Sequence, residues 1–218
     1  MSCCTPAAYG TVFDGREARR SARTYRKKGL DPTARRIVRF LSAQEDVPRT
    51  VLEIGGGIGA LQMELLRAGA SRTTNIELSP AYEAVAQSLL ADAGLTDHVQ
   101  RHLGDFAAAP EAFPLADVVI MHRVVCCYPE VARLVRSAAD HAQRYLAMSY
   151  PRDAWWVRGG LAAENLLLFS MRGIGFRVFV HSPQTILAIA SSYGFTPAFQ
   201  HRGWVWEAVV LRREPGSR

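Results

Sequence analysis

The sequence lacks the features that would place it in a membrane or in an oxidising compartment. None of its apolar stretches approaches the ~20 residues that a membrane span requires, and its N-terminus has no hydrophobic signal region. Its four cysteines form two adjacent pairs, and neighbouring cysteines rarely have the geometry to bridge each other. We therefore expect a cytoplasmic protein with reduced thiols and no membrane span.

Low-complexity linkers, internal repeats and zinc-ligand spacings are also missing. No C-x-x-C pair and no nearby pair of histidines offers tetrahedral ligands, so we expect no metal. At 218 residues with 49% hydrophobic content, the chain can bury the core of one structural domain. Within that domain we expect an N-terminal basic helical arm over residues 1–45 and a main part over residues 46–218.

Glycine, in contrast, is concentrated in one short segment. Residues Val51–Ala60 read VLEIGGGIGA, an apolar strand that runs into a glycine-rich turn and then a helix. Gly55, Gly57 and Gly59 permit positive φ and let a ligand lie against the backbone, while the helix start offers unpaired N–H groups. This pattern predicts a nucleotide site. Gly55, Gly57 and Ala60 also fit the dinucleotide pattern, so the spacing alone leaves NAD(P) open.

An acidic residue beside the glycine loop favours a cationic ligand. Glu53 lies within the strand, two residues before the first glycine, where a pyrophosphate would gain nothing from a carboxylate. S-adenosylmethionine (SAM) carries an ammonium and a sulfonium but no phosphate, so an acid beside the loop suits it. We therefore predict SAM rather than NAD(P) as the cofactor.

Further acids follow the next two expected strands. Residues 72–78 read as a strand that ends in Glu77, about 20 residues beyond the glycines, the distance at which a carboxylate reaches ribose hydroxyls. Residues 99–103 read as a third strand, after which Asp105 can accept a hydrogen bond from the adenine amino group. Phe106 can offer the adenine ring an apolar face.

These features together resemble the class I SAM-dependent methyltransferases over roughly residues 49–211. In that family the E-x-G-x-G-x-G loop holds the methionine part, the acid ending the second strand binds ribose, and the Gly-Asp pair after the third strand contacts adenine. The resemblance implies a doubly wound, Rossmann-like α/β fold with a seven-stranded sheet and an N-terminal helical cover. The runs 195–201 and 204–211 match the family's C-terminal antiparallel hairpin. The implied cofactor-binding residues are Glu53, Gly55, Gly57, Gly59, Glu77, Leu78, Asp105, Phe106 and His122.

The methyl acceptor of such a sheet should lie after the fourth strand. Asp117 opens that expected strand, and we expect it to be a turn residue rather than a ligand contact. Residues 122–129 read HRVVCCYP and resemble the magnesium-protoporphyrin methyltransferase branch. In that branch a histidine implicated in catalysis precedes the Tyr-Pro pair, whereas Cys127 stands there in this sequence. The resemblance therefore does not carry porphyrin over as the acceptor.

Three residues of this segment are candidates for catalysis. His122 is the candidate base for a phenol, amine or thiol acceptor, the alternative being a histidine that caps the strand end. Arg123 can position an acceptor that is already ionised, such as a carboxylate. Tyr128 either orients the acceptor or packs under the next helix.

The cysteines allow a second kind of acceptor. Thiolates bind soft metals and metalloids, so Cys126 and Cys127, helped by Cys3 and Cys4, could present arsenite or a related acceptor. Adjacent cysteines are poor chelates, and free cysteine is a favoured small buried residue, so simple packing is the preferred interpretation.

Basic residues are concentrated near the N-terminus. Residues 13–29 are expected to form a helix, anchored by Tyr25, that covers the cofactor mouth. Asp31 is expected to cap a second helix, with Pro32 at its first position, that packs on the core. The basic charge fits a solvated face, attraction of an acidic small substrate, or phosphate contacts with RNA or DNA. The basic residues are Arg16, Arg19, Arg20, Arg23, Arg26, Lys27, Lys28, Arg35, Arg36 and Arg39.

Residues 152–181 are expected to form a cover insertion between the fifth strand, 144–151, and the terminal hairpin. Its aromatic residues, among them Trp155, Phe169 and Phe176, stack on a flat acceptor, pack in the core or form a subunit contact. A glycine pair at 159–160 weakens the helix expected there and suggests a hinge.

The sequence therefore predicts a monomeric or homodimeric SAM-dependent methyltransferase that alkylates O, N or S of a small acidic or aromatic acceptor. RNA methylation and metalloid S-methylation are the alternatives with the same cofactor. No N-P-P-Y or D-P-P-Y motif for holding a flipped base follows the fourth strand, which disfavours nucleic acid. An NAD(P)-dependent oxidoreductase is disfavoured by the lack of a Tyr-x-x-x-Lys dyad, and a non-catalytic nucleotide-binding subunit stays open.

Overall fold

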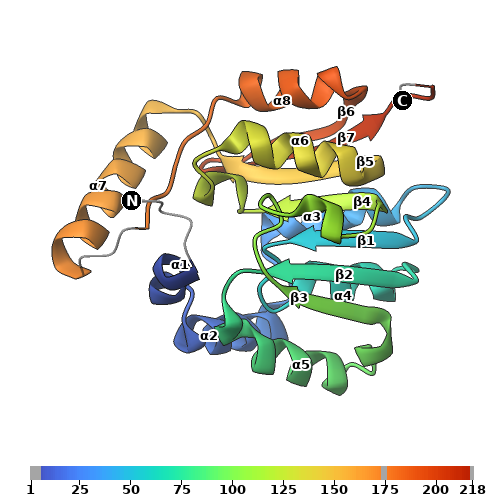
Figure 1. The fold of residues 1–218 in the computed structure, drawn as a ribbon, viewed down its shortest axis with the longest axis horizontal. Coiled ribbons are helices and arrows are strands. Elements are labelled where there is room, and N and C mark those ends of the chain that lie inside the picture. The colour runs from blue at the N-terminus through green and yellow to red at the C-terminus, as the bar shows by residue number, and fades with distance from the viewer. Residues whose placement is uncertain (1–5, 173–175, 217–218) are drawn as a thin grey trace.

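A seven-stranded sheet with the strand order β3-β2-β1-β4-β5-β7-β6 forms the centre of the molecule (Figure 1). The structure, a computed structural model, describes residues 6–172 and 176–216, so Cys3 and Cys4 lie outside the described residues. Strands β1 to β5 run parallel, and β7 pairs antiparallel with both β5 and β6. This confirms the predicted doubly wound sheet with its terminal hairpin. The strands are β1 (Thr50–Ile54), β2 (Arg72–Glu77), β3 (Val99–Leu103), β4 (Ala116–His122), β5 (Ala142–Pro151), β6 (Phe195–Arg202) and β7 (Trp206–Arg213).

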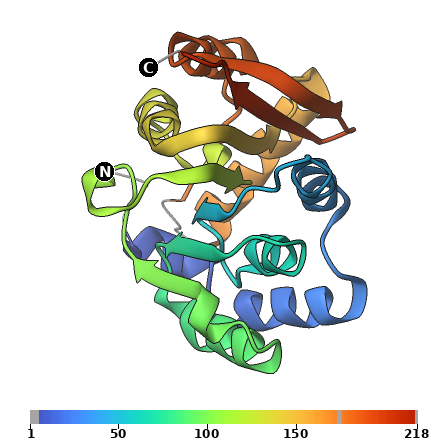
Figure 2. The ribbon, with the colours of Figure 1, turned by 90° about the vertical axis from the view of Figure 1, so that its right-hand side faces the viewer.

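Helices cover both faces of the sheet (Figure 2). In the part of the chain that the structure describes, no helix pairs the length of a membrane span with the required apolar character. The helices are α1 (Pro6–Val12), α2 (Gly15–Lys28), α3 (Pro32–Ser42), α4 (Ala60–Arg67), α5 (Glu83–Asp92), α6 (Val131–His141), α7 (Trp155–Arg172) and α8 (Pro183–Ser192).

Strand β4 explains why this sheet needs helices on both faces. Val118 and Ile120 pack in one apolar cluster with α3 and α4, whereas Val119 and Met121 pack in another cluster with α6 and α8. Successive side chains of a strand point to opposite faces, so the continuous apolar run supplies both cores.

The N-terminal helices are fixed to the core by specific contacts. Helix α2 buries Ala18 and Ala22 against α5. The Tyr25 hydroxyl donates to Glu64 Oε1 of α4 at 2.5 Å, which confirms Tyr25 as an anchor. Asp31 caps α3, as its position before Pro32 predicts, by accepting from the backbone N–H groups of the first turn. The segment from α1 to α3 thus forms a docked N-terminal cover.

Helix α7 lies beyond the carboxyl ends of the parallel strands, at the left of Figure 1. It continues through the glycine pair, so the helix is not interrupted at the expected hinge. Trp155 is 81% exposed and Phe169 is 64% exposed, so neither is buried against the sheet. Phe176 instead packs edge-on against two rings of the N-terminal segment. Its ring centroid lies 5.4 Å from that of Tyr9 and 5.5 Å from that of Phe13. The insertion therefore meets the N-terminal cover through Phe176.

The terminal hairpin turns later than the sequence suggests. The Gly203 N–H donates to the Trp206 carbonyl at 2.9 Å, so Trp204 and Val205 form an exposed turn and β7 begins at Trp206. The predicted start of this strand at Trp204 is therefore wrong by two residues.

Asp117 ties β1 to β4 at the amino ends of the strands. Its Oδ2 accepts from the backbone N–H groups of Arg49 at 2.7 Å and Thr50 at 3.0 Å, and its own N–H donates to Thr50 Oγ1 at 2.8 Å. The carboxylate is therefore used by the backbone, at the edge of the sheet opposite to the glycine loop.

We expect Asp117→Ala to lower the free energy of unfolding by about 1–2 kcal/mol, because two backbone donors lose their acceptor. Urea unfolding measures this loss. Asp97→Ala, at an exposed position, is the matched control and should change stability by less than about 0.5 kcal/mol. Equal stability of the two variants would contradict the structural role of Asp117.

Candidate functional site

The strand order reverses between β1 and β4, so the loops that follow these two strands lie side by side. Gly55 shows how close they come. Its φ is +64°, and a Cβ built there would lie 2.6 Å from Val124 Cγ2 of the neighbouring loop. Only glycine fits this position, which leaves the backbone of the loop accessible to a ligand.

The backbone of Gly57 is held by hydrogen bonds at both its N–H and its carbonyl. Its N–H donates to Glu77 Oε2 at 2.8 Å, and its carbonyl accepts from Arg101 Nη2 at 3.0 Å. The Arg101 side chain is itself held by Glu83 Oε2 at 2.9 Å and is almost fully buried. Gly57 and Gly59 both have positive φ, at +56° and +77°, and Gly59 lies at the N-cap of α4.

Gly56, which the spacing of the motif did not single out, is also required. A Cβ on Gly56 would overlap the Asn75 amide and lie 2.8 Å from Glu53 Cδ. Glu53, Asn75 and Arg101 occupy the same register position on β1, β2 and β3, so their side chains form one polar row beneath the loop. The central glycine is therefore needed because buried polar side chains pack against its backbone.

Two cavities meet at this loop. The smaller, about 160 Å³, reaches from Gly55 and Gly57 towards the carboxyl ends of β2 and β3. The larger, about 470 Å³, extends from the same glycines to the residues of α2 and the start of α3. Together they have the size of a small-molecule site, which typically holds roughly 300–1,000 Å³. Phe13, Gly55, Gly57, Tyr82, His122 and Arg123 line both cavities.

The smaller cavity brings together the residues predicted to contact adenosine. Glu77 and Leu78 lie at the end of β2, and Asp105 and Phe106 follow β3. Glu77 is buried and accepts from the Gly57 N–H and, through Oε1 at 2.9 Å, from the Ser79 N–H. Asp105 Oδ2 accepts from the Tyr128 hydroxyl at 3.2 Å. Sequence reasoning did not foresee the bonds from Gly57 and Tyr128, because these donors are 20 and 23 residues away from their acceptors.

Phe106 and Gly59 play different parts from the other predicted cofactor residues. The Phe106 ring is buried, with its centroid 5.8 Å from Phe113 and 5.2 Å from His141. Gly59 lies behind the loop, where a Cβ would overlap the Gln62 amide, and it lines neither cavity. Phe106 therefore forms part of the wall of the smaller cavity, whereas Gly59 packs against Gln62 behind the loop.

Glu53 faces the larger cavity but is 1% exposed, and its Oε2 has no hydrogen-bond partner among the described residues. Burial raises the pKa of Glu53 to about 8, against the opposing charge of Arg101. The carboxyl group is therefore largely protonated at neutral pH. The sequence correctly indicated an acid beside the loop, but its burial, and hence its charge state, depends on the packing of three strands.

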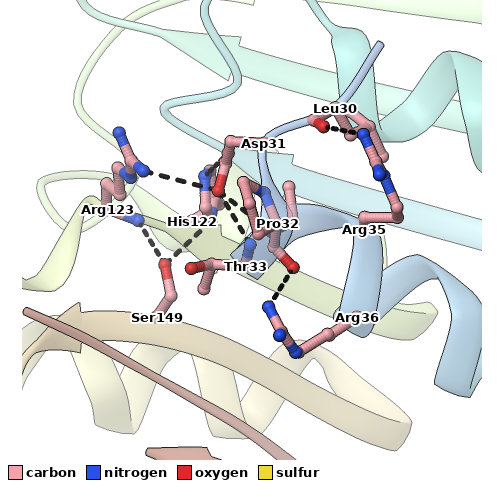
Figure 3. Close-up of polar contacts among 10 residues, drawn as sticks. Leu30, Asp31, Pro32, Thr33, Arg35, Arg36, His122, Arg123 and Ser149 are labelled. Atoms are coloured by element: carbon pink, nitrogen blue, oxygen red, sulfur yellow. Dashed lines mark hydrogen bonds and ion pairs between the residues drawn. The ribbon is translucent and has the colours of Figure 1, made fainter. Parts of the chain in front are cut away.

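His122 is held at the end of β4 by two partners (Figure 3). Its Nε2 lies 2.9 Å from Asp31 Oδ2, and its Nδ1 lies 2.8 Å from Ser149 Oγ of β5. A carboxylate only accepts, so the Nε2 atom carries a proton and Nδ1 of the neutral ring accepts from the Ser149 hydroxyl. Sequence analysis assigned Asp31 to capping alone and did not consider Ser149.

Arg123 has a strained backbone with φ +59°, the one positive φ of a non-glycine residue in the described part of the chain. The Arg123 N–H donates to the Ser149 carbonyl oxygen at 3.2 Å and to the Ser149 hydroxyl oxygen at 3.0 Å. The guanidinium lies 3.4 Å from Asp31 Oδ1 and stacks over the Trp206 ring at 4.5 Å from its centroid. The side chain is 42% exposed, so Arg123 faces the cavities with a fixed orientation.

The cysteine pair is buried beside the smaller cavity. The sulfur atoms of Cys126 and Cys127 lie 3.7 Å apart, and each lies 3.5 Å from the Arg123 carbonyl oxygen. The Tyr9 hydroxyl donates to the Cys127 carbonyl at 2.5 Å. Within the described ranges, no group of three or more His, Cys, Asp and Glu side chains is placed to hold a metal ion.

The fold and the site define a nucleotide-binding enzyme of the doubly wound α/β class, with a glycine loop after β1 and carboxylates after β2 and β3. The sequence matches the methyltransferase domain family over residues 23–198, so the chain belongs to that family and is a SAM-dependent methyltransferase. The carboxylates and the side-chain-free loop fit this cofactor, which offers hydroxyl and amino donors and carries no phosphate. The family also removes the oxidoreductase alternative.

Solved structures share the fold. Magnesium protoporphyrin IX methyltransferase from Synechocystis PCC 6803, crystallised with S-adenosylhomocysteine, matches with a TM-score of 0.67 and 22% identity, over 84% of this chain and 82% of that chain. An O-methyltransferase family 2 protein from Planctomyces limnophilus DSM 3776, in complex with apigenin, matches with a TM-score of 0.67 and 18% identity, over 92% of this chain and 62% of that chain. These likenesses confirm the predicted fold.

A curated relative, arginine N(omega)-methyltransferase from Streptomyces achromogenes subsp. streptozoticus, is 32% identical over 82 residues. The match covers 37% of this chain and 23% of that protein, so the chain spans about a quarter of the relative's length.

We expect Gly56→Ala to weaken binding of S-adenosylhomocysteine by about tenfold or more, because the added Cβ must displace the loop or the buried Asn75 side chain. Isothermal titration calorimetry measures the affinity. Gly160→Ala, where a Cβ meets open space within α7, is the control and should leave it unchanged. A Gly56→Ala variant with native affinity would show that the loop is not confined as described.

Glu53 should make the protein less stable as the pH rises. The unfolded chain ionises this carboxyl above its ordinary pKa of 4.5, whereas the folded protein keeps the proton up to a pKa of about 8. Raising the pH between these values therefore favours unfolding. We expect the stability of the native protein relative to Glu53→Gln, measured by urea unfolding, to fall across this range. A difference that stays constant with pH would contradict the assignment.

Proposed function

We propose that the protein transfers the methyl group of SAM to a small acidic acceptor that enters over the carboxyl end of β4. The observation that carries this proposal is the position of Arg123, which lines both cavities where they meet and whose side chain is oriented by Asp31 and Trp206. A guanidinium fixed in this way is suited to bind one oxygen of a carboxylate through a charge-assisted hydrogen bond.

The cofactor contacts follow from the smaller cavity. We assign the main chain of Gly55 and Gly57 to contact the cofactor, Glu77 to bind the ribose hydroxyls and Asp105 to accept from the adenine amino group. Tyr128 donates to Asp105, so we assign it to orienting that carboxylate rather than the acceptor. Leu78 and the buried Phe106 provide apolar walls.

SAM supplies a methyl group activated by its sulfonium. In the transfer, the bond from the acceptor atom to the methyl carbon forms as the carbon–sulfur bond breaks, so the protein's task is to hold the acceptor in line. An ionised carboxylate already has the lone pair it needs and requires no base. Arg123 can hold one acceptor oxygen while the other faces the methyl group.

His122 is better suited to orient neighbouring groups than to take up a proton. Both ring nitrogens have partners, Asp31 and Ser149, so no lone pair faces a cavity in this arrangement. A phenol, amine or thiol acceptor is the second candidate, favoured by the carboxylate that supports the imidazole. In that case one of the two contacts of His122 must open to accept the acceptor proton.

The relatives support a small acceptor. Two of the solved structures are named for magnesium protoporphyrin IX or hold apigenin, and the curated relative is named for arginine. The exposed basic residues of α2 and α3 would attract an acidic small molecule towards the larger cavity. RNA remains the alternative that such a surface allows.

Incubation of the protein with methyl-labelled SAM and a cell extract tests this proposal. We expect the label to appear in a small carboxylic acid as an alkali-labile ester. Label in RNA, or in an alkali-stable amine, would overturn the acidic-acceptor assignment.

We expect Arg123→Met to raise KM for the labelled acceptor by about tenfold to a hundredfold, because one charge-assisted contact is lost. The kcat should change less, and S-adenosylhomocysteine affinity should stay near the native value. Steady-state kinetics with the product identified above provides the measurement. Arg133→Met, which removes an exposed arginine of α6, is the control. An unchanged KM in Arg123→Met would remove Arg123 from the acceptor site.

A further inference from the structure

The amino-acid end of SAM carries an ammonium and a carboxylate, and the acid first expected to bind the ammonium is unsuited to it. Glu53 is buried beneath the glycine loop with a raised pKa, so it is largely uncharged at neutral pH. A neutral carboxyl gives little of the attraction that an ammonium requires. Another acid must face the same space.

Asp31 meets this requirement by its position. It lines the larger cavity together with Glu53, Gly55 and Gly57, but it comes from the α2–α3 junction of the N-terminal cover. Burial tends to raise the pKa of Asp31, but the hydrogen bond from His122 and the positive charge of Arg123 outweigh it, so its pKa lies well below its usual range. The Asp31 carboxylate is therefore ionised at neutral pH.

The Asp31 carboxylate also has capacity for one more donor. Its Oδ1 accepts from the N–H groups of Thr33 and Ala34 and faces Arg123 at 3.4 Å. Its Oδ2 accepts from His122 (Figure 3), and no other described residue donates a hydrogen bond to it. A carboxylate oxygen can accept two hydrogen bonds, so Oδ2 retains an acceptor site.

We propose that Asp31 binds the ammonium group of the cofactor, so that the N-terminal cover, and not the acid of the β1 strand, recognises the amino-acid end. The cap of α3, the contact to His122 and the cofactor then share one carboxylate. This inference rests on the family's cofactor and is independent of the acceptor, so its test uses no acceptor.

Three ligands separate the parts of the cofactor. S-adenosylhomocysteine has the ammonium and the carboxylate, its decarboxylated analogue has the amine alone, and 5′-methylthioadenosine has neither. We expect Asp31→Asn to weaken the affinity for S-adenosylhomocysteine and for its decarboxylated analogue by about tenfold or more. The affinity for 5′-methylthioadenosine should change by less than about twofold. Asparagine keeps the capping oxygen and the volume, so α3 remains capped. Calorimetric titration measures each affinity.

Asp14→Asn is the matched control, because Asp14 caps α2 in the same cover but lines neither cavity. It should leave all three affinities unchanged. Asp31→Ser, which keeps a capping hydroxyl but shortens the side chain, should repeat the selective loss if Asp31→Asn does not fold. Circular dichroism at each condition reports folding.

Three results would overturn the proposal. Equal weakening of all three ligands by Asp31→Asn would mean that the residue acts by holding His122 or the cover in place. Unchanged affinity for every ligand would remove Asp31 from the cofactor site. Selective loss in Glu53→Gln, without loss in Asp31→Asn, would place the ammonium at the end of β1. None of these results depends on which acceptor the enzyme methylates.

Discussion

The site depends on the backbone conformation of Gly57. Glu77 accepts from its N–H and Arg101 donates to its carbonyl, so an acid at the end of β2 and a base on β3 fix the loop that follows β1. The loop cannot shift without breaking a charge-assisted hydrogen bond on one side or the other. Gly55 and Gly57 have positive φ, a conformation that favours glycine, and because glycine has no side chain the space above the loop stays open.

A second set of contacts joins the cover to this loop. Asp31, His122 and Ser149 form a chain of hydrogen bonds from the start of α3 through β4 to β5. Each contact links segments far apart in the sequence, and Asp31 and His122 are 91 residues apart. The same chain supports the strained backbone of Arg123. The walls of the two cavities therefore share their supports, which couples the two halves of the site.

Much of the fold could be read from short-range patterns. The apolar run of β4 indicated a strand buried on both faces, and Asp31 before Pro32 and Ser182 before Pro183 indicated helix starts. Local patterns were less informative in the terminal hairpin, where a single backbone bond from Gly203 moves the start of β7 to Trp206. They were also misleading in α7, where the glycine pair does not interrupt the helix.

The order of the strands and helices, the glycine loop and the family could all be predicted from residue spacing along the chain. The charge state of each acid could not be predicted in this way, because it depends on the folded arrangement. Glu53 retains its proton near neutral pH because three strands bury it, whereas Asp31 stays ionised because the hydrogen bond from His122 and the charge of Arg123 outweigh the effect of its burial. Ionisation depends on desolvation and on neighbouring charges, and both are set by segments that meet after the chain has folded.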